Sequence, residues 1–85
     1  MPQVTLTELA RNELGRVLPS SAQELIAMDI FNLPLDPTPE LVGRLAEPGH
    51  YSLPVDNNWL IHYVIKPDGN LIVLSIFQGA EHTLH

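Results

Sequence analysis

The chain has 85 residues, with ten Asp and Glu, four Lys and Arg, and a net charge of −6. This acidic balance argues against a surface that follows nucleic-acid phosphates, because such binding depends on Lys and Arg displacing counterions. Cysteine is absent, so neither disulfides nor thiolate metal sites supplement the core. We therefore expect one domain over residues 1–85 and, with 45% hydrophobic residues, apolar surface that another chain covers.

The sequence does not have the pattern expected of a membrane-spanning segment or of a secretory leader. No apolar run approaches the roughly 18 residues that cross a bilayer, and the N-terminus lacks a basic region followed by an apolar stretch. We therefore expect a cytoplasmic protein that does not associate with membranes.

The N-terminal residues predict a strand followed by a helix. Val4-Thr5-Leu6 alternates as a strand does, and Thr7 is a suitable N-cap for a helix from about Glu8 to Leu18. An apolar stripe at helical spacing is expected to face the core. It consists of Leu9, Ala10, Leu14, Val17 and Leu18.

A second helix is predicted from about Ala22 to Asn32. Pro19 ends the first helix, and Ser21 with Glu24 three residues later forms a capping-box pattern. The apolar arc of this helix is wide, and we expect one side of it to pack on a sheet. Its members are Leu25, Ile26, Met28, Ile30 and Phe31.

The middle of the chain predicts a connector and then a strand. Three prolines make the segment 33–39 stiff and incompatible with a regular helix. A short helical turn is expected from Thr38 or Pro39 to Leu45. Glu47-Pro48-Gly49 then reverses the chain into a strand over His50–Val55.

Two apolar runs near the C-terminus predict a β-hairpin. Trp59–Ile65 and Leu71–Phe77 are rich in β-branched and aromatic residues, and Pro67-Asp68-Gly69 between them favours a tight turn. The element order is then strand, helix, helix and three strands. This order predicts an α+β fold, with an N-terminal strand and two helices packed on one face of a four-stranded, mainly antiparallel sheet.

Counting from the loop predicts which hairpin side chains share a face. Ile65 pairs with Leu71 and Ile61 with Ser75 on one face. The second face is also apolar, although two helices can cover only one side, so we expect it to bind a partner. Its members are Leu60, His62, Val64, Ile72, Leu74 and Ile76.

The segment from Asn57 to Leu84 resembles the RelE/ParE superfamily of bacterial toxin–antitoxin toxins, and ParE most closely. Members typically carry Arg-Trp-Leu-Ile-x-Tyr-Arg, a short turn with Gly, an apolar strand and a His-Gly-x-Arg-Asp ending. The matching positions here are Trp59, Leu60, Ile61, Tyr63, Gly69, Val73, Leu74 and Gly79.

The departures from this family pattern are systematic. Asn58, Val64 and Ser75 stand where the family often has Arg, and Gln78 and Glu81 replace the His and Arg of the ending. The resemblance implies that RelE-type toxins use basic residues there to hold and cleave ribosome-bound messenger RNA. Uncharged or acidic side chains cannot stabilise phosphate charge in that way. For ParE-type toxins the resemblance implies an action through protein binding to DNA gyrase. Such binding tolerates the loss of these basic residues more easily than RNA cleavage does.

Four histidines are the candidates for acid–base chemistry near neutral pH: His50, His62, His82 and His85. We favour a core or interface role for His62, and salt bridging for Arg44, which could also face the groove of His50 and Tyr51. Any catalytic role would fall to His62, Arg44 or His82. We expect no metal site and no cofactor, and enzyme chemistry has no positive support.

The favoured interpretation is a toxin-like component of a type II toxin–antitoxin, or plasmid-stabilisation, system that acts through protein–protein binding. The expected partner is a cognate antitoxin-like protein or a second copy of the chain, and direct nucleic-acid binding is not expected. One alternative is a ribosome-dependent mRNA endoribonuclease of RelE type that uses His62, His82, Tyr51 and Arg44. Another is a non-toxic homodimer that keeps the fold.

Overall fold

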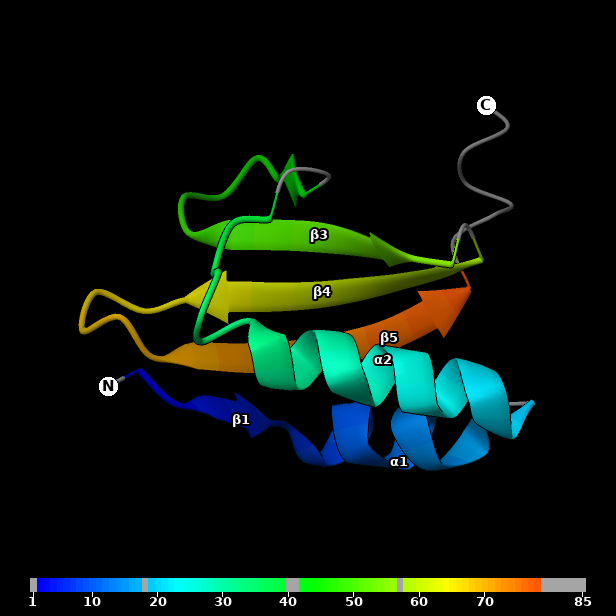
Figure 1. The fold of residues 1–85 in the computed structure, drawn as a ribbon. Coiled ribbons are helices and arrows are strands. Elements are labelled where there is room, and N and C mark those ends of the chain that lie inside the picture. The colour runs from blue at the N-terminus through cyan, green and yellow to red at the C-terminus, as the bar shows by residue number, and fades with distance from the viewer. Residues whose placement is uncertain (1, 18, 40–41, 57, 79–85) are drawn as a thin grey trace.

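In a computed structural model, the described residues are 2–17, 19–39, 42–56 and 58–78. They form one five-stranded sheet and two helices (Figure 1). The strands are β1 (Val4–Leu6), β2 (Gly43–Arg44), β3 (His50–Val55), β4 (Trp59–Ile65) and β5 (Leu71–Gln78). The helices are α1 (Glu8–Arg16) and α2 (Ser20–Asn32).

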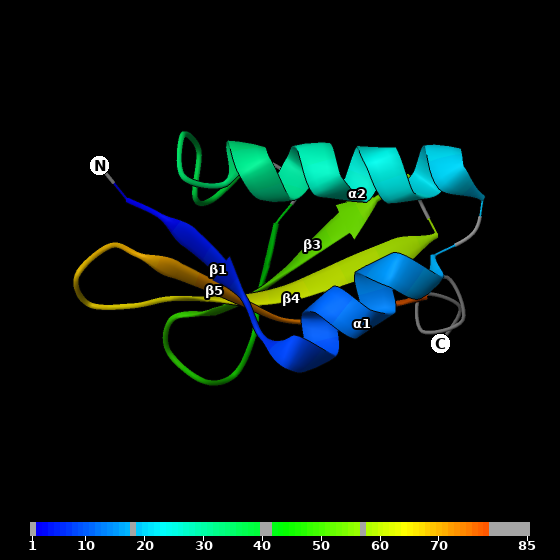
Figure 2. The same cartoon turned by 90° about the horizontal axis from the view of Figure 1, so that it is seen from below.

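The sheet has the order β1-β5-β4-β3-β2, with β1 parallel to β5 and all other pairs antiparallel. Figure 2 shows α2 stacked over the sheet, while α1 continues from β1 along the edge of β5. The predicted α+β class is confirmed. The sheet has one strand more than predicted, because Gly43–Arg44 pairs with β3 where a helical turn was expected.

Helix α1 starts where the sequence predicts. The Thr7 hydroxyl oxygen accepts a hydrogen bond from the Ala10 N–H at 3.1 Å and donates to the Leu74 carbonyl at 2.9 Å. The N-cap therefore also fastens the helix to β5. The helix ends at Arg16, earlier than predicted, and Leu18 lies outside the described residues. Leu9 does not join the core, because it lies on the opposite side from the sheet and is 58% exposed.

Helix α2 begins at Ser20, so the predicted capping box is wrong. Pro19 occupies the N-cap position, and its carbonyl accepts the N–H groups of Ala22 and Gln23. Ser21 consequently lies inside the first turn, where its hydroxyl does not cap the helix. The predicted packing of one side is confirmed, since Ala22, Ile26 and Ile30 are buried.

The hairpin of β4 and β5 follows the predicted register only near its loop. Ile65 pairs with Leu71 and Tyr63 with Val73, but His62 pairs with Ser75, so Leu74 is an extra residue. Such a β-bulge shifts every later side chain to the other face of its strand. The predicted pairing of Ile61 with Ser75 is therefore wrong.

The bulge lies where β5 stops pairing with β1 and begins to contact α1. Beside it, β1 ends and α1 begins, and Thr7 hydrogen-bonds the carbonyls of both Val73 and Leu74. Further along, the Ile76 N–H donates to Glu13 Oε1 at 3.0 Å. Hydrogen bonds from the N-cap and a side chain of α1 to β5 thus take the place of the backbone hydrogen bonds that a longer β1 would have made.

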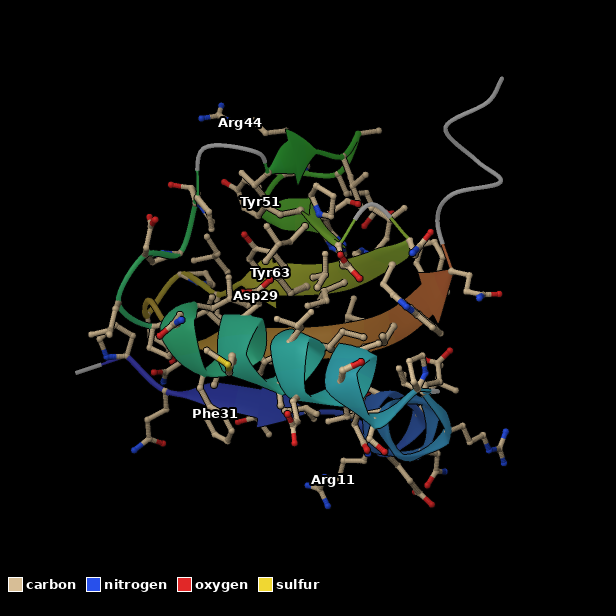
Figure 3. All side chains as sticks on the ribbon, turned by 45° about the vertical axis from the view of Figure 1, so that its right-hand side comes forward. Arg11, Asp29, Phe31, Arg44, Tyr51 and Tyr63 are labelled. Carbon is tan, nitrogen blue, oxygen red and sulfur yellow. The ribbon has the colours of Figure 1, made fainter. Side chains whose placement is uncertain are left out.

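The core lies between the helices and one face of the sheet. Its fully buried residues from the strands include Ile61, Tyr63, Val73 and Ile76, which meet Ile26 and other residues of the helices. The Tyr63 hydroxyl donates to the Pro37 carbonyl, and its ring stacks on Tyr51 with centroids 5.6 Å apart (Figure 3). Burial, with smaller contributions from Tyr51 and Asp36, raises the pKa of Tyr63 to about 12.

Candidate functional site on the outer face of the sheet

The face of the sheet opposite α2, called here the outer face, carries a continuous set of half-buried side chains. They belong to the three long strands and alternate with the core residues. The outer-face residues are His50, Ser52, Leu60, His62, Val64, Ile72, Leu74, Ser75 and Phe77.

A row of three polar side chains in contact lies at one end of this face. His50 Nδ1 and His62 Nε2 are 3.2 Å apart, and His50 Nε2 lies 3.2 Å from Glu47 Oε2. His50 and His62 are diagonal neighbours on β3 and β4, because His62 pairs with Ser52. We call this group the Glu47–His50–His62 row.

Backbone hydrogen bonds hold the turn that carries Glu47. The Leu45 N–H donates to the His50 carbonyl at 2.9 Å, and the His50 N–H donates to the Glu47 carbonyl at 3.2 Å. Gly49 adopts φ +82°, and a Cβ there would lie 3.1 Å from the Ile65 carbonyl oxygen. Glycine therefore lets the turn approach the end of β4 closely, which sets His50 beside His62.

The surroundings of His62 favour its neutral form. Burial, and next the nearby His50, lower the pKa of His62, while Glu47 opposes this shift. His62 is consequently neutral at neutral pH. The contact of His50 Nε2 with Glu47 leaves His50 Nδ1 for the hydrogen bond with His62 Nε2, in which the tautomers of the two rings decide which nitrogen donates.

Of the predicted catalytic candidates, only His62 lies in this row. Arg44 pairs with Tyr51 and so shares the face of Tyr51 and Tyr63, opposite to His62 (Figure 3). The expectation that Arg44 shares a groove with His50 is therefore wrong. His82 lies outside the described residues.

Five of the six predicted partner-binding residues lie on the outer face: Leu60, His62, Val64, Ile72 and Leu74. Their binding role stays a prediction. Ile76 was assigned to this face wrongly, because the bulge turns it into the core, where it is 2% exposed. Ser75 takes its place opposite His62.

Sequence reasoning missed Glu47 and its link to His50. The available signal was the spacing of an acidic residue and a histidine on either side of Pro48-Gly49, a turn that brings its flanking residues together. Among the described residues, no group of three or more His, Cys, Asp or Glu side chains gathers as a metal site. No described helix is long and apolar enough to span a membrane.

No protein-family model and no curated protein sequence matches the chain. Solved structures do match. The toxin–antitoxin complex RelBE2 from Mycobacterium tuberculosis superposes with a TM-score of 0.75 and 19% identity, covering 92% of this chain and 99% of the matched one. The isolated Escherichia coli RelE toxin gives 0.78 and 15%, covering 92% and 84%.

The toxin–antitoxin complex RelBE from E. coli also matches, with a TM-score of 0.77 and 15% identity over 91% of this chain and 95% of the matched one. At such identities the likeness establishes the fold. The chain has the α+β fold of RelE toxins.

Proposed function

We propose that this protein is the toxin-like component of a bacterial type II toxin–antitoxin system and that a cognate antitoxin-type protein binds it. The shared fold supports the proposal, together with the fact that two of the matching structures are complexes of a toxin with its antitoxin. The outer face is the proposed working surface. Its apolar side chains come from β4 and β5, and it lies on the side of the sheet that α2 leaves free (Figure 2).

The favoured mode of action is binding to a protein target. The observation that carries it is the lack of cationic side chains on the outer face. The four Lys and Arg residues of the chain are Arg11, Arg16, Arg44 and Lys66. The first two lie on α1, Arg44 faces the opposite side, and Lys66 lies in the hairpin loop beside Asp68. An apolar face of this kind suits a protein partner better than a phosphate backbone.

RNA cleavage is a second candidate, and the Glu47–His50–His62 row favours it. Neutral His62 would take the proton of a ribose 2′-hydroxyl, whose oxygen then attacks phosphorus. The bond from phosphorus to the 5′-oxygen breaks, and an acid donates a proton to that leaving oxygen. His50, whose Nε2 lies 3.2 Å from Glu47 Oε2, is the candidate for that acid. The products would be a 2′,3′-cyclic phosphate and a 5′-hydroxyl.

Inducible expression of matched variants separates these modes. Growth arrest that is lost in both His50→Ala and His62→Gln, but kept in Leu60→Lys, would establish the cleavage mode. Arrest that is lost in Leu60→Lys and kept in the histidine variants would establish the protein-binding mode. Leu9→Ser, an exposed change on α1, serves as the control. Absence of arrest in the wild type, with no partner captured on co-expression of the neighbouring gene, would contradict the toxin proposal and favour a non-toxic homodimer.

A further inference from the structure

Helix α2 carries a second apolar surface, on the side away from the core. Met28, Phe31 and Leu35 are 59%, 74% and 71% exposed, and Leu25 on the same helix is 43% exposed. Leu25, Met28 and Phe31 recur every three residues and lie within about 120° of one another around the helix axis, given roughly 100° per residue, and Leu35 lies in the turn that follows α2. We call these four residues the α2 stripe. In Figure 3, Phe31 leaves α2 on the side opposite Tyr51 and Tyr63.

Clustering distinguishes this stripe from ordinary surface hydrophobicity. Of the large hydrophobic residues that are exposed in the described part of the chain, only Leu9 and Leu45 lie outside the stripe. Scattered apolar side chains are normal on a soluble protein, whereas a contiguous row marks an interaction surface. Apolar residues three or four positions apart share one side of a helix, and rows of this kind are what one helix packs on in another.

The surroundings of the stripe are acidic. Between Val17 and Gly43 the sequence has four acidic residues and no Lys or Arg. Asp29 and Asp36 line a pocket of about 390 Å³ between α2 and β3. Neither carboxylate forms an ion pair with any residue of the described ranges. Figure 3 shows Asp29 on the side of α2 that faces Tyr63, which puts this carboxylate beside the Leu25 edge of the stripe and away from Phe31.

The acidic residues around the α2 stripe indicate which kind of partner would bind it. A second copy packed α2 against α2 would bring two sets of unpaired carboxylates together, on chains that each carry −6. We propose that the α2 stripe docks a basic amphipathic helix of a partner protein, with apolar residues on Met28 and Phe31 and a Lys or Arg reaching the pocket of Asp29 and Asp36. Burial raises the pKa of Asp29, so its charged form is one that a partner cation would stabilise.

This surface is distinct from the outer face and does not depend on the toxin role. The stripe residues are exposed on α2 and the turn after it, whereas the outer face lies on the side of the sheet away from α2 (Figure 2). A partner that engages both would enclose the molecule from two sides. The two sites are therefore tested separately.

The test uses the full chain and a synthetic amphipathic peptide of about 18 residues, long enough for several helical turns. Its apolar side is Leu and its polar side is Lys. A peptide of the same composition in scrambled order and one with Glu in place of Lys are the controls. Calorimetry measures binding to the wild type, to the double variant M28S/F31S and to the matched control Leu9→Ser.

We expect the Lys peptide to bind the wild type and Leu9→Ser equally, and its affinity for M28S/F31S to fall by about tenfold or more, because buried aromatic anchors dominate helix docking. The Glu peptide and the scrambled peptide should not bind. Changing Asp29 and Asp36 to Asn should weaken the binding and reduce its salt dependence.

Three results would overturn the proposal. If the scrambled peptide binds with the same affinity as the ordered one, the binding is non-specific charge attraction. Unchanged affinity of M28S/F31S would remove the stripe from the interface. Self-association in sedimentation that M28S/F31S abolishes would assign the stripe to a second copy. Growth arrest is not a readout here, so failure of the toxin proposal leaves this test intact.

Discussion

His50 Nδ1 lies 3.2 Å from His62 Nε2, and this contact makes the stability of β3 against β4 sensitive to protonation. Two neutral imidazoles share one hydrogen bond, whereas two imidazolium ions repel each other. Glu47 can compensate only at the far nitrogen of His50.

Lowering the pH should therefore destabilise the protein through His62. The pKa of His62 in the folded chain is below its ordinary value of 6.5, so the unfolded chain binds more protons in this range. The stabilising contribution is complete above about pH 6.5 and is lost as the pH falls through the folded pKa. Thermal unfolding at pH 7.5 and pH 5.5 should show a larger loss for the wild type than for His62→Gln. Equal losses would mean that other groups govern this range.

Removing the carboxylate of Glu13 should destabilise the bulged part of β5. In Glu13→Ala the Ile76 N–H loses its acceptor in a partly buried place, and such a loss costs about 1–3 kcal/mol. Glu13→Gln keeps an acceptor oxygen and should retain most of the stability. Urea unfolding measures both, and Glu8→Ala on the exposed side of α1 is the control. An unaffected Glu13→Ala would indicate that water satisfies this N–H.

The hydroxyl of Tyr63 should contribute more to stability than that of Tyr51. Tyr63→Phe removes the hydrogen bond to the Pro37 carbonyl from the core, where the expected cost is about 1 kcal/mol. Tyr51→Phe keeps the stacked ring and should change the free energy of unfolding little. Equal effects in urea unfolding would show that the bond to Pro37 does not anchor the 33–39 connector.

Two Gly→Ala substitutions should act in opposite directions. Gly49→Ala places a Cβ 3.1 Å from the Ile65 carbonyl oxygen at φ +82°, so the turn must distort at a cost of about 1 kcal/mol or more. Gly15→Ala meets no atom within 4 Å on α1 and should stabilise the helix by up to about 1 kcal/mol. Shifts in Tm measure both changes. A Gly49→Ala chain as stable as the wild type would contradict the close approach of the turn to β4.

Most of the elements were predictable because short-range patterns determine them. The bounds of β3 and β4, the Thr7 cap and the register beside the hairpin loop all follow from neighbouring residues. The bulge was not predictable from neighbouring residues, and the groups that contact β5 beside it come from α1, more than sixty residues earlier, as Glu13 does at Ile76. One inserted residue was enough to place Ile76 on the wrong face.

The candidate site was predictable only in part for the same reason. His62 was identified, but its partners come from β3 and from the turn before it, and only tertiary structure joins them. The exposed half of the α2 arc was also missed. A wide apolar arc does not reveal which of its sides meets the sheet, and Leu25, Met28 and Phe31 lie on the side that does not.

The parallel pairing of β1 with β5 has a consequence for synthesis of the protein. The Leu71 N–H donates to the Gln3 carbonyl at 2.8 Å, so the first strand finds its neighbour only in the last one. A chain emerging from the ribosome exposes Val4 and Leu6 until β5 follows, and contacts of such long range form slowly. A prematurely terminated product that lacks β5 has no partner for β1 and lacks the Leu74 carbonyl that accepts from the Thr7 hydroxyl. The outer face is therefore complete only once β5 has been synthesised.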